Sequence, residues 1–504
     1  MRNFLANRKF KQRLKSLSKS QSPSKGNKPK LKIGFLSQPG SYGSVVELFL
    51  AAVLKEIGYV VTIVFVDQSF PLLECHHKDR PEQWSRMTRR NCSSFRRLAK
   101  LLRLQIIPAS TLSDALDSPL SLQDQELIVN ASLLRHYRVG KLRESLKDLE
   151  QRKKLFTETF RKSCQVGQYF SSGERVDRLI MNHGLYATTG PARLVALKNN
   201  VPVLTFDRAK KQDTLNFSWT HSTDRWSIDD VWEECGSIPL RPEEEKVLDK
   251  YLQTRRNHSE DIYQYNRGVP TTAELLRQKL NIPEQKKILV LFTNVLWDAA
   301  SSERDIIFES PIEWVSRTIE IAEEHQESLH LILRIHPAEL VIGTEDGFQQ
   351  IIESYFPKLP QNVSLLPANS DVNSWTLYEL GDVGIVHTTT AGLEMAMEKK
   401  AVIVVSETHY RNKGFTIDPT SADEYTQLIL NSKINESQQI NSRLAKKYAY
   451  LIFIKYQFYF PFVSMDRQGR WMVQSTEFKD IISDPQFSHL IDCLDNRKGV
   501  LNPC

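Results

Sequence analysis

Cysteine is scarce in this chain and never occurs in a metal-binding spacing. The 504 residues contain six cysteines, and no two of them form a C-x-x-C pair. Zinc ribbons, thioredoxin-like redox sites and disulfide-stapled scaffolds are therefore excluded as classes. We expect scattered, reduced thiols of the kind found in cytosolic proteins. They are Cys75, Cys92, Cys164, Cys235, Cys493 and Cys504.

Long hydrophobic runs are also missing. No stretch of eighteen apolar residues occurs, and the basic N-terminus lacks the apolar core of a secretory signal. The nearest candidate for a membrane segment, residues 448–463, is interrupted by Lys455, Gln457 and Pro461. We interpret it as a buried helix or strand, with an aromatic surface at the membrane interface as the alternative. The sequence predicts a cytoplasmic protein.

Several motifs of nucleotide and hydrolase chemistry are absent. The chain has no G-x-G-x-x-G fingerprint, Walker A loop, H-E-x-x-H helix or G-x-S-x-G nucleophile elbow in the required context. Dinucleotide oxidoreductases, P-loop NTPases and serine hydrolases are therefore poor fits. The turn at residues 40–43 is rich in glycine, but it would serve equally as a plain connection between a strand and a helix.

Positive charge is concentrated near the N-terminus. The formal charge is +7, yet residues 1–30 contain ten Lys or Arg and no Asp or Glu, so the rest of the chain carries −3. A second basic stretch, residues 80–103, has Glu82 as its only acidic residue. We interpret residues 1–30 as a disordered basic arm that could attach to an anionic membrane surface. The nearly neutral body lacks basic residues interleaved with aromatic ones, which argues against a nucleic-acid partner.

Apolar strands alternate with helical segments over two stretches of the chain, which is typical of parallel sheets with crossover helices. We therefore predict an α/β fold with two open domains, a linker, and a C-terminal helix that returns to the first domain. The predicted strands are residues 31–37, 59–66, 177–184 and 201–207, and then 286–294, 329–337, 363–367, 382–389 and 401–405. The predicted parts are the arm 1–30, the first domain with a helical insertion 31–235, the linker 236–284, the second domain 285–435 and a helical and aromatic extension 436–504.

The first candidate site is a strand end in the second domain. Open α/β sheets bind ligands beyond the carboxyl ends of their strands. The apolar strand at 331–335 is followed by His336, and Pro337 prevents continuation of the strand. His336 could donate to a phosphate oxygen, while Glu339 could orient His336 or bind a sugar hydroxyl. A purely structural histidine is the alternative.

The second candidate site follows the strand that ends at His387. Thr388, Thr389 and Thr390 form the turn, and a helix begins near residue 391. Three hydroxyls and the first N–H groups of a helix suit a phosphate. Glu394, one turn into the helix, could accept hydrogen bonds from a ribose. The alternative is simple helix capping by Thr390 with Glu394 facing solvent.

These motifs belong to a longer series of blocks between about residues 175 and 465. The blocks are MNHGLYATTGPA (181–192), FTNVLWDA (292–299), LRIHPAE (333–339), HTTTAGLEMA (387–396) and RNKGFTID (411–418). In them the sequence resembles bacterial capsule polysaccharide biosynthesis proteins, a group of GT-B-type glycosyltransferases that includes capsular Kdo transferases. The resemblance implies two Rossmann-like domains facing a cleft. It also implies transfer of a sugar from a nucleotide-activated donor, with a CMP-sugar favoured, to a glycan or glycolipid acceptor.

The resemblance also implies roles for particular residues. His336 and Pro337, together with the threonine turn, would hold the phosphate of the donor, and Glu394 would bind its ribose. The rest of the donor site would be Asn294 and Asp298 at the first strand end of the second domain, and Lys413 and Gly414 in the loop after its last strand.

Sugar transfer further needs a base for the acceptor hydroxyl and a clamp for the departing nucleotide. We expect the base to come from the first domain, where His183 is the preferred candidate and Asp207 and Glu47 are the others. Helix capping is the structural alternative for each of them. No D-x-D-like element occurs near these positions, so we expect metal-independent transfer without a cofactor.

Two other functions stay open at this point. One is a phosphotransferase that uses a CDP-linked polyol, and the other is a noncatalytic GT-B-like scaffold in polysaccharide assembly. In each case, we expect a cytoplasmic protein that is peripheral on the inner face of the membrane if the basic arm attaches there.

Overall fold

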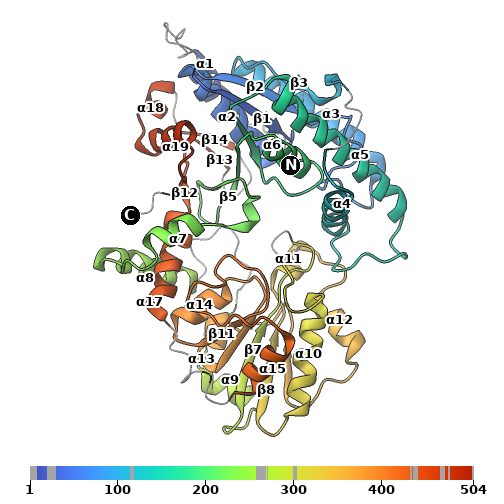
Figure 1. The fold of residues 1–504 in the computed structure, drawn as a ribbon, viewed down its shortest axis with the longest axis vertical. Helices are drawn as coiled ribbons and strands as arrows, with labels where there is room; N and C mark the ends of the chain where they lie inside the picture. Colours follow the sequence, from blue (N-terminus) through green and yellow to red (C-terminus); the bar gives the residue numbers. More distant parts are fainter. Residues whose placement is uncertain are drawn as a thin grey trace. The chain divides into compact units, whose positions relative to one another are not determined.

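The computed structural model describes residues 8–19, 30–113, 119–256, 268, 271–298, 304–431, 434, 441–465, 471–474 and 477–501. The chain forms two compact units (Figure 1). Unit 1 takes in Met1–Tyr137, Leu142–Ser227 and Tyr456–Asn502, and the main part of unit 2 is Ile228–Lys455. The short segment Arg138–Lys141 also belongs to unit 2.

Unit 1 is built on a seven-stranded sheet with the order β12-β6-β5-β4-β1-β2-β3. The strands from β5 to β3 are parallel, while β6 pairs antiparallel with both β5 and β12. Because β2 and β4 lie on opposite sides of β1, the direction of winding changes at β1. The strands are β1 Lys32–Ser37, β2 Val60–Phe65, β3 Ile107–Pro108, β4 Arg178–Asn182, β5 Val203–Arg208, β6 Thr214–Trp219 and β12 Phe458–Tyr459.

Helices cover both faces of this sheet. On one face, α2 (Tyr42–Glu56) and α3 (Trp84–Leu101) share a core with Phe35 and Phe65. On the other face, α5 (Leu149–Gln168) and α6 (Gly190–Lys198) pack against Leu36. Unit 1 also contains α4 Leu122–Tyr137, the 3-10 turns Pro81–Gln83, Ala109–Thr111 and Thr223–Arg225, and the π-helical turn Tyr169–Gly173.

Part of the predicted disordered arm is an ordered helix. Helix α1 (Arg8–Lys19) buries Phe10, Leu14 and Leu17 in the same core as α2. The Arg13 guanidinium donates to the main-chain carbonyl of Val473 at 2.5 Å. The prediction of disorder is therefore wrong for residues 8–19, because apolar side chains spaced three and four residues apart give this basic segment one buried face. Residues 1–7 and 20–29 of the predicted arm lie outside the described residues.

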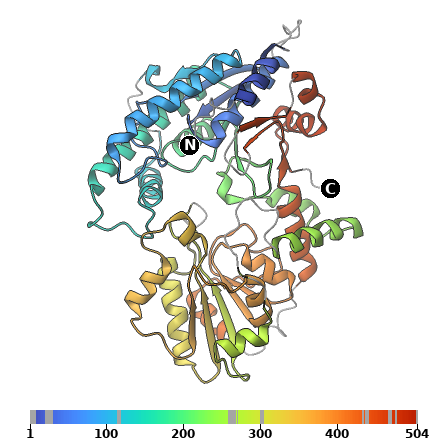
Figure 2. The same cartoon turned by 180° about the vertical axis from the view of Figure 1, so that it is seen from behind.

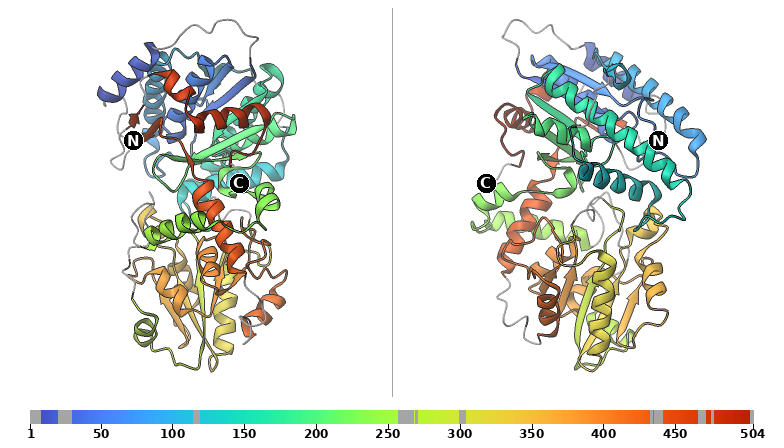
Figure 3. Two further views of the ribbon diagram at one scale, coloured as in Figure 1. Left: turned by 90° about the vertical axis from the view of Figure 1, so that its left-hand side faces the viewer. Right: turned by 45° about the vertical axis from the view of Figure 1, so that its right-hand side comes forward.

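The C-terminal segment also belongs to unit 1. It contains the hairpin strands β13 (Val463–Met465) and β14 (Trp471–Val473), followed by α18 (Phe478–Ile482) and α19 (Pro485–Asn496). Phe487 and Leu490 of α19 are buried in the core that α2 shares, and Figure 3 shows this red segment beside the blue strands of the unit. This confirms the predicted return of a C-terminal helix to the first domain.

Unit 2 contains a five-stranded sheet in which every pair is parallel, with the order β11-β10-β7-β8-β9. It and the parallel part of the unit 1 sheet confirm the predicted α/β fold with two Rossmann-like domains. The strands are β7 Lys287–Phe292, β8 Leu329–Arg334, β9 Val363–Leu366, β10 Val383–Val386 and β11 Ala401–Val404.

Helices also cover both faces of the unit 2 sheet (Figure 2). On one face, α10 (Pro311–Glu324), α12 (Phe348–Tyr355) and α15 (Ala422–Leu430) share a core with the strands. On the other, α14 (Ala391–Met397) approaches closely, since a Cβ on Gly384 would lie 2.5 Å from the Met395 sulfur, and α13 (Ser374–Leu380) packs its Tyr378 ring 5.6 Å from the Phe292 ring of β7. The remaining helical segments are α7 Asp229–Cys235, α8 Pro242–Arg256, α9 Ala273–Lys279, α11 Ala338–Ile342, α17 Ser442–Tyr450 and the π-helical turn Leu451–Lys455.

Most of the aromatic segment at 448–463 is buried, as predicted, although Tyr459 is 51% exposed. Tyr448 lies in α17, Phe453 in the π-helical turn and Phe460 just after β12, and all three side chains are buried. Helices α8 and α9 occupy much of the predicted linker 236–284 and belong to unit 2. Within the described ranges, no helix is both long and apolar enough to cross a membrane.

Glu47 lies inside the core of unit 1 on α2. Its carboxyl group accepts hydrogen bonds from the Ser37 hydroxyl and, at 2.9 Å, from the Asn182 N–H. Burial raises the pKa of Glu47 to about 8, and the two hydrogen bonds offset only part of that rise. A carboxyl group that is 1% exposed is not available to a substrate hydroxyl. The structure therefore corrects the expectation that Glu47 could be the base, and gives it a place in the core.

Glu47 should make unit 1 less stable as the pH rises. Because its folded pKa lies above its unfolded value, its favourable contribution is complete below about pH 4.5 and is lost as the pH passes about 8. We expect the free energy of unfolding of Glu47→Gln to fall less as the pH rises. Between about pH 4.5 and 8, the variant should therefore gain a few kcal/mol in stability relative to the wild type. Urea unfolding followed at several pH values would measure it. The exposed Glu158→Gln on α5 is the control, and parallel curves for wild type and Glu47→Gln would contradict the expectation.

Candidate functional site

At the strand ends of unit 2, the loops after β7, β8 and β10, which carry predicted site residues, come together. In the sheet, Phe292 of β7 is paired with Val386 of β10 and with Arg334 of β8, so the loops after these strands start side by side. The Asn294 amide donates to the Thr388 hydroxyl, and the Thr388 N–H donates back to Asn294 Oδ1 at 3.4 Å. The loops after β7 and β10 are therefore joined by a reciprocal pair of hydrogen bonds.

The loop after β8 is joined to the same place through His336. The His336 N–H donates to the Thr293 hydroxyl at 3.0 Å. Its ring Nδ1 accepts from the Ala338 N–H at 3.1 Å, so in the neutral ring the proton is on Nε2. Strand β8 ends at Arg334, and Pro337 immediately precedes α11. The ring is thus held in the form that donates from Nε2.

The threonine turn is built differently from a simple helix cap. Thr390 precedes α14 without a capping hydrogen bond from its side chain, and Thr389 Oγ1 accepts from the Ala391 N–H at 3.4 Å. The Tyr410 hydroxyl donates to the Thr389 carbonyl at 2.6 Å and so braces the turn from behind. All three threonines are half-buried. The alternative of plain capping by Thr390 is therefore wrong.

Glu394 is buried rather than solvent-facing, so the second half of that alternative is also wrong. Its Oε1 accepts from the Arg255 guanidinium of α8 at 2.5 Å and 3.1 Å, and its Oε2 accepts from the Tyr378 hydroxyl at 2.7 Å. Burial and the nearby carboxylate raise the pKa of Tyr378 far above its usual value, which keeps the hydroxyl a donor. The structure places Glu394 at the centre of a buried network, so a ribose would share its oxygens with Arg255 and Tyr378.

The carboxylate of Glu339 faces the start of α12. Its Oε1 accepts from the Phe348 N–H at 3.1 Å, and a Cβ on Gly347 would lie 2.3 Å from Oε2. Burial raises its pKa to about 7. This position gives Glu339 a structural role in holding the loop between α11 and α12, which differs from the predicted contact with a sugar hydroxyl.

Lys413 is largely buried, and its ammonium group forms an ion pair at 2.5 Å with Asp229 at the start of α7. Gly414 has a φ of +84°, a left-handed conformation that favours glycine. Asp298 is exposed in the turn after β7, where its N–H donates to the Val295 carbonyl at 3.1 Å. A donor phosphate at Lys413 would therefore compete with Asp229.

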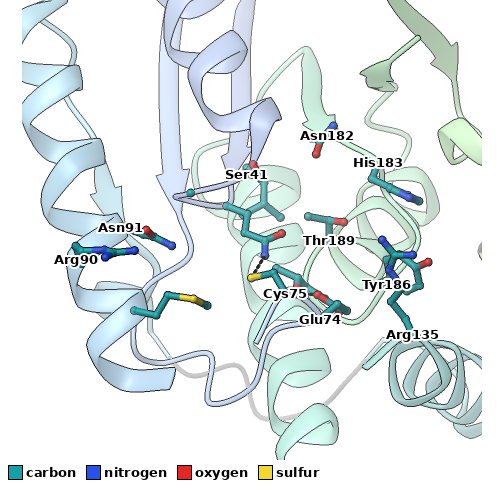
Figure 4. A pocket seen from close by; sticks show the side chains of 15 residues that line it. Ser41, Glu74, Cys75, Arg90, Asn91, Arg135, Asn182, His183, Tyr186 and Thr189 are labelled. Carbon is teal, nitrogen blue, oxygen red and sulfur yellow. Dashed lines mark hydrogen bonds between the residues drawn. The ribbon is translucent and has the colours of Figure 1, made fainter. Parts of the chain in front are cut away.

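Unit 1 contains a cavity of about 330 Å³ at the carboxyl ends of β1 and β4 (Figure 4). Of the three base candidates, only His183 lines it. Its ring lies 5.1 Å from that of Tyr186, its φ is +65°, and its buried Nδ1 has no hydrogen-bond partner among the described residues. The lining residues are Leu36, Gln38, Gly40, Ser41, Glu74, Cys75, Met87, Arg90, Asn91, Arg135, Asn182, His183, Tyr186, Thr188 and Thr189.

The structure places Asp207 on β5, outside this lining. Its Oδ1 accepts from the Arg208 N–H at 2.7 Å and from the Asn182 amide at 3.4 Å. Both contacts are local to the sheet edge, and they give the carboxylate a structural role. His183 is thus the base candidate that the geometry favours.

Sequence reasoning missed most of the polar side chains of this cavity, including Glu74, Asn91 and Arg135. Two signals pointed toward it. Arg90 lies in the basic stretch at 80–103, and the block at 181–192 contributes Tyr186 and the two threonines that follow it. Neither signal identifies a cavity by itself, because the other walls come from α4 and from the loop after β2.

No group of three or more His, Cys, Asp or Glu side chains is arranged to hold a metal ion in the part of the chain that the structure describes.

The match to a family model falls mainly on unit 2. Residues 255–459 match the family model described as "Capsule polysaccharide biosynthesis protein". This confirms the predicted resemblance over about two fifths of the chain, and the segment contains Asn294, His336, the threonine turn, Glu394 and Lys413. The block at 181–192 and the cavity of unit 1 lie outside the matched segment. No curated protein matches the chain in sequence.

Several solved structures resemble the chain. Two come from KpsC of Thermosulfurimonas dismutans. Its beta Kdo 2,4 transferase has 15% identity and a TM-score of 0.38, with 59% of this chain and 84% of that chain covered. Its beta Kdo 2,7 transferase has 12% identity and a TM-score of 0.34, with 66% and 89% covered. A UDP-GlcNAc 2-epimerase from Neisseria meningitidis has 11% identity and a TM-score of 0.25, with 84% and 99% covered.

Loss of the Glu394 carboxylate should destabilise unit 2 strongly. The change Glu394→Ala leaves the Arg255 guanidinium, 13% exposed, without its buried partner, and we expect a loss of about 3–5 kcal/mol in the free energy of unfolding. Urea denaturation of the full chain would measure it. The matched control is Glu398→Ala, which removes an exposed ion pair with Arg256 and should cost about 0–1 kcal/mol. Equal losses in the two variants would contradict the buried-network role.

Proposed function

We propose that the protein is a glycosyltransferase of capsule or surface polysaccharide synthesis, with the sugar donor bound by unit 2. The observation that carries this proposal is the joining of Asn294, His336 and Thr388 at adjacent strand ends, within the segment that matches the capsule biosynthesis family. Adjacent strand ends of a parallel sheet are where α/β proteins bind nucleotides. We propose a nucleotide-activated sugar as the donor, and favour a CMP-sugar.

In this proposal, the phosphate of the sugar donor accepts hydrogen bonds from side chains on two loops. His336 offers its Nε2 proton, and the hydroxyls of Thr389 and Thr390 lie on the neighbouring turn. Lys413 adds positive charge if the phosphate displaces Asp229 from its ammonium group. Hydrogen-bond donors that are in position before the reaction stabilise the departing phosphate, because they need no reorganisation when negative charge develops on it. The proposal assigns this clamp to protein groups and gives no role to a metal ion.

The transfer step then follows ordinary glycosyl chemistry. An acceptor hydroxyl oxygen bonds to the anomeric carbon as the bond from that carbon to the donor phosphate oxygen breaks. The nucleotide leaves with the bonding electrons, and the hydroxyl proton passes to a base. We propose His183 as that base, because its ring lines the cavity of unit 1 where a glycan or glycolipid acceptor would bind.

Nucleotide binding tests the donor site directly. We expect the full-length protein to bind one nucleotide in a calorimetric panel of CMP, CDP, UDP and GDP, and His336→Ala and Thr389→Ala to weaken that binding at least about tenfold. Thr426→Ala, at a half-buried position of α15, is the matched control.

The outcomes separate the candidate functions. Normal nucleotide binding by both site variants would show that the site is wrong. Release of nucleotide from a CMP-sugar in the presence of an acceptor supports the transferase. Turnover of a CDP-linked polyol alone would favour the phosphotransferase, and no binding at all would favour a scaffold.

We also propose that unit 1 attaches to an anionic membrane surface, through helices rather than a loose arm. Neither α1 nor α3 contains an Asp or Glu. At 100° per residue, the basic side chains of α3 occupy roughly a third of its circumference, opposite its buried residues. The two helices contact each other, so their exposed basic faces belong to one unit. The exposed basic residues of α3 are Arg86, Arg89, Arg90, Arg96, Arg97 and Lys100.

Membrane attachment is best tested by charge removal, because deleting residues 1–30 would also remove the buried face of α1. We expect the combined change of Lys9, Lys15 and Lys19 to Gln to weaken binding to phosphatidylserine vesicles at least about tenfold, at roughly 1 kcal/mol per charge. Vesicle co-sedimentation would measure it. The control is Lys246→Gln with Lys250→Gln on exposed positions of α8. Equal binding by all three proteins would contradict the proposal, as would binding to RNA but not to vesicles.

A further inference from the structure

The cavity of unit 1 lies where the winding of its sheet changes direction. Strand β1 has β2 on one side and β4 on the other, and the cavity is lined by Leu36 of β1, Asn182 of β4 and His183 directly after it. In open α/β sheets, the crevice between two such strands is left uncovered because their crossover helices lie on opposite faces of the sheet. Here α2 and α6 lie on opposite faces. The cavity is thus a consequence of the topology.

Two helices begin at this cavity. Helix α2, of fifteen residues, starts directly after Gly40 and Ser41, and α6, of nine residues, starts directly after Thr188 and Thr189. All four of these residues line the cavity. The N-terminus of a helix carries partial positive charge, so two helix starts make the cavity favourable for an anion.

Charged side chains add further positive charge to the cavity. Arg90 of α3 and Arg135 of α4 line different sides of it, with Arg90 beside Asn91 and Arg135 near Tyr186 (Figure 4). The two guanidinium groups and two helix starts therefore act together on anything bound between them.

The one carboxyl group in the lining, Glu74, is engaged in the wall. Its oxygens accept from the Thr188 N–H at 3.1 Å, the Thr188 hydroxyl at 2.5 Å and the Ser132 hydroxyl at 3.3 Å. Burial raises its pKa, although these hydrogen bonds counteract the rise. Glu74 fixes the loop that leads into α6, and it is the only acidic side chain in the lining.

We propose that this cavity binds the acidic group of a sugar, a carboxylate or a phosphate, between Arg90 and Arg135. A volume of about 330 Å³ suits one small molecule or the end of a chain. Asn91, Ser41 and Thr189 supply polar groups for its hydroxyls. The identity of this ligand rests on the proposed function: it is the end of the glycan that accepts the new sugar. An acidic sugar would therefore lie at the site of chain growth.

The test uses the full-length protein and three sugars of similar size. We expect ligand-observed NMR to detect binding of glucuronic acid, glucose 6-phosphate or both, and at least about tenfold weaker binding of glucose. The two acidic probes distinguish a carboxylate ligand from a phosphate ligand. Equal binding of glucose and the acidic sugars would overturn the proposal. So would a result in which neither acidic sugar binds at millimolar concentrations.

Variants connect the binding to the cavity. Arg90→Gln and Arg135→Gln should each weaken binding of the acidic sugar about tenfold or more, whereas Arg161→Gln, on an exposed position of α5, should leave it unchanged. Unchanged binding in both cavity variants would overturn the proposal. Each variant should keep wild-type affinity for the nucleotide. A protein that binds the acidic sugar but no nucleotide would refute the proposed donor site while leaving this inference intact.

Discussion

The parallel register of β10, β7 and β8 is the constraint on which the candidate donor site depends. Parallel strands end at the same edge of a sheet, so residues nearly a hundred positions apart, such as Asn294 and Thr388, become neighbours. Each loop then needs only a short polar side chain to reach the next. The same constraint acts in unit 1, where β1 and β4 end together and leave a cavity between α2 and α6. In both units the chemistry lies where parallel strands stop.

The buried network around Glu394 connects this site to the rest of unit 2. Glu394 lies on α14, directly after the threonine turn, and it binds Arg255 from α8 and Tyr378 from α13. A buried carboxylate needs such partners, because an unpaired one would be costly. Tyr410 braces the turn through the Thr389 carbonyl. The turn is therefore supported by α8 and α13, which contribute no predicted donor residue, and by Tyr410 of the loop that carries Lys413.

Much of the fold follows from the sequence, and the site follows only in part. All nine predicted strands occur, because apolar runs bounded by turn residues are a local signal. Strand β6 was missed, since its antiparallel pairing depends on a neighbour and not on its own pattern. The strand-end rule found His336 and the threonine turn. It could not show that Glu394 and Lys413 are already engaged, because Arg255 and Asp229 are more than a hundred residues away from them.

The path of the chain has a consequence for the order in which the protein is made. Unit 1 is discontinuous, and its core joins Phe10 and the residues of α2 to Phe487 and Leu490 near the C-terminus. All five strands of unit 2 have been synthesised by residue 404, and its last main segment ends at Lys455. The main part of unit 2 is therefore synthesised before the residues of α19 that complete the core of unit 1. Although its first strand is made early, unit 1 can complete its core only after Phe487 and Leu490 have been synthesised.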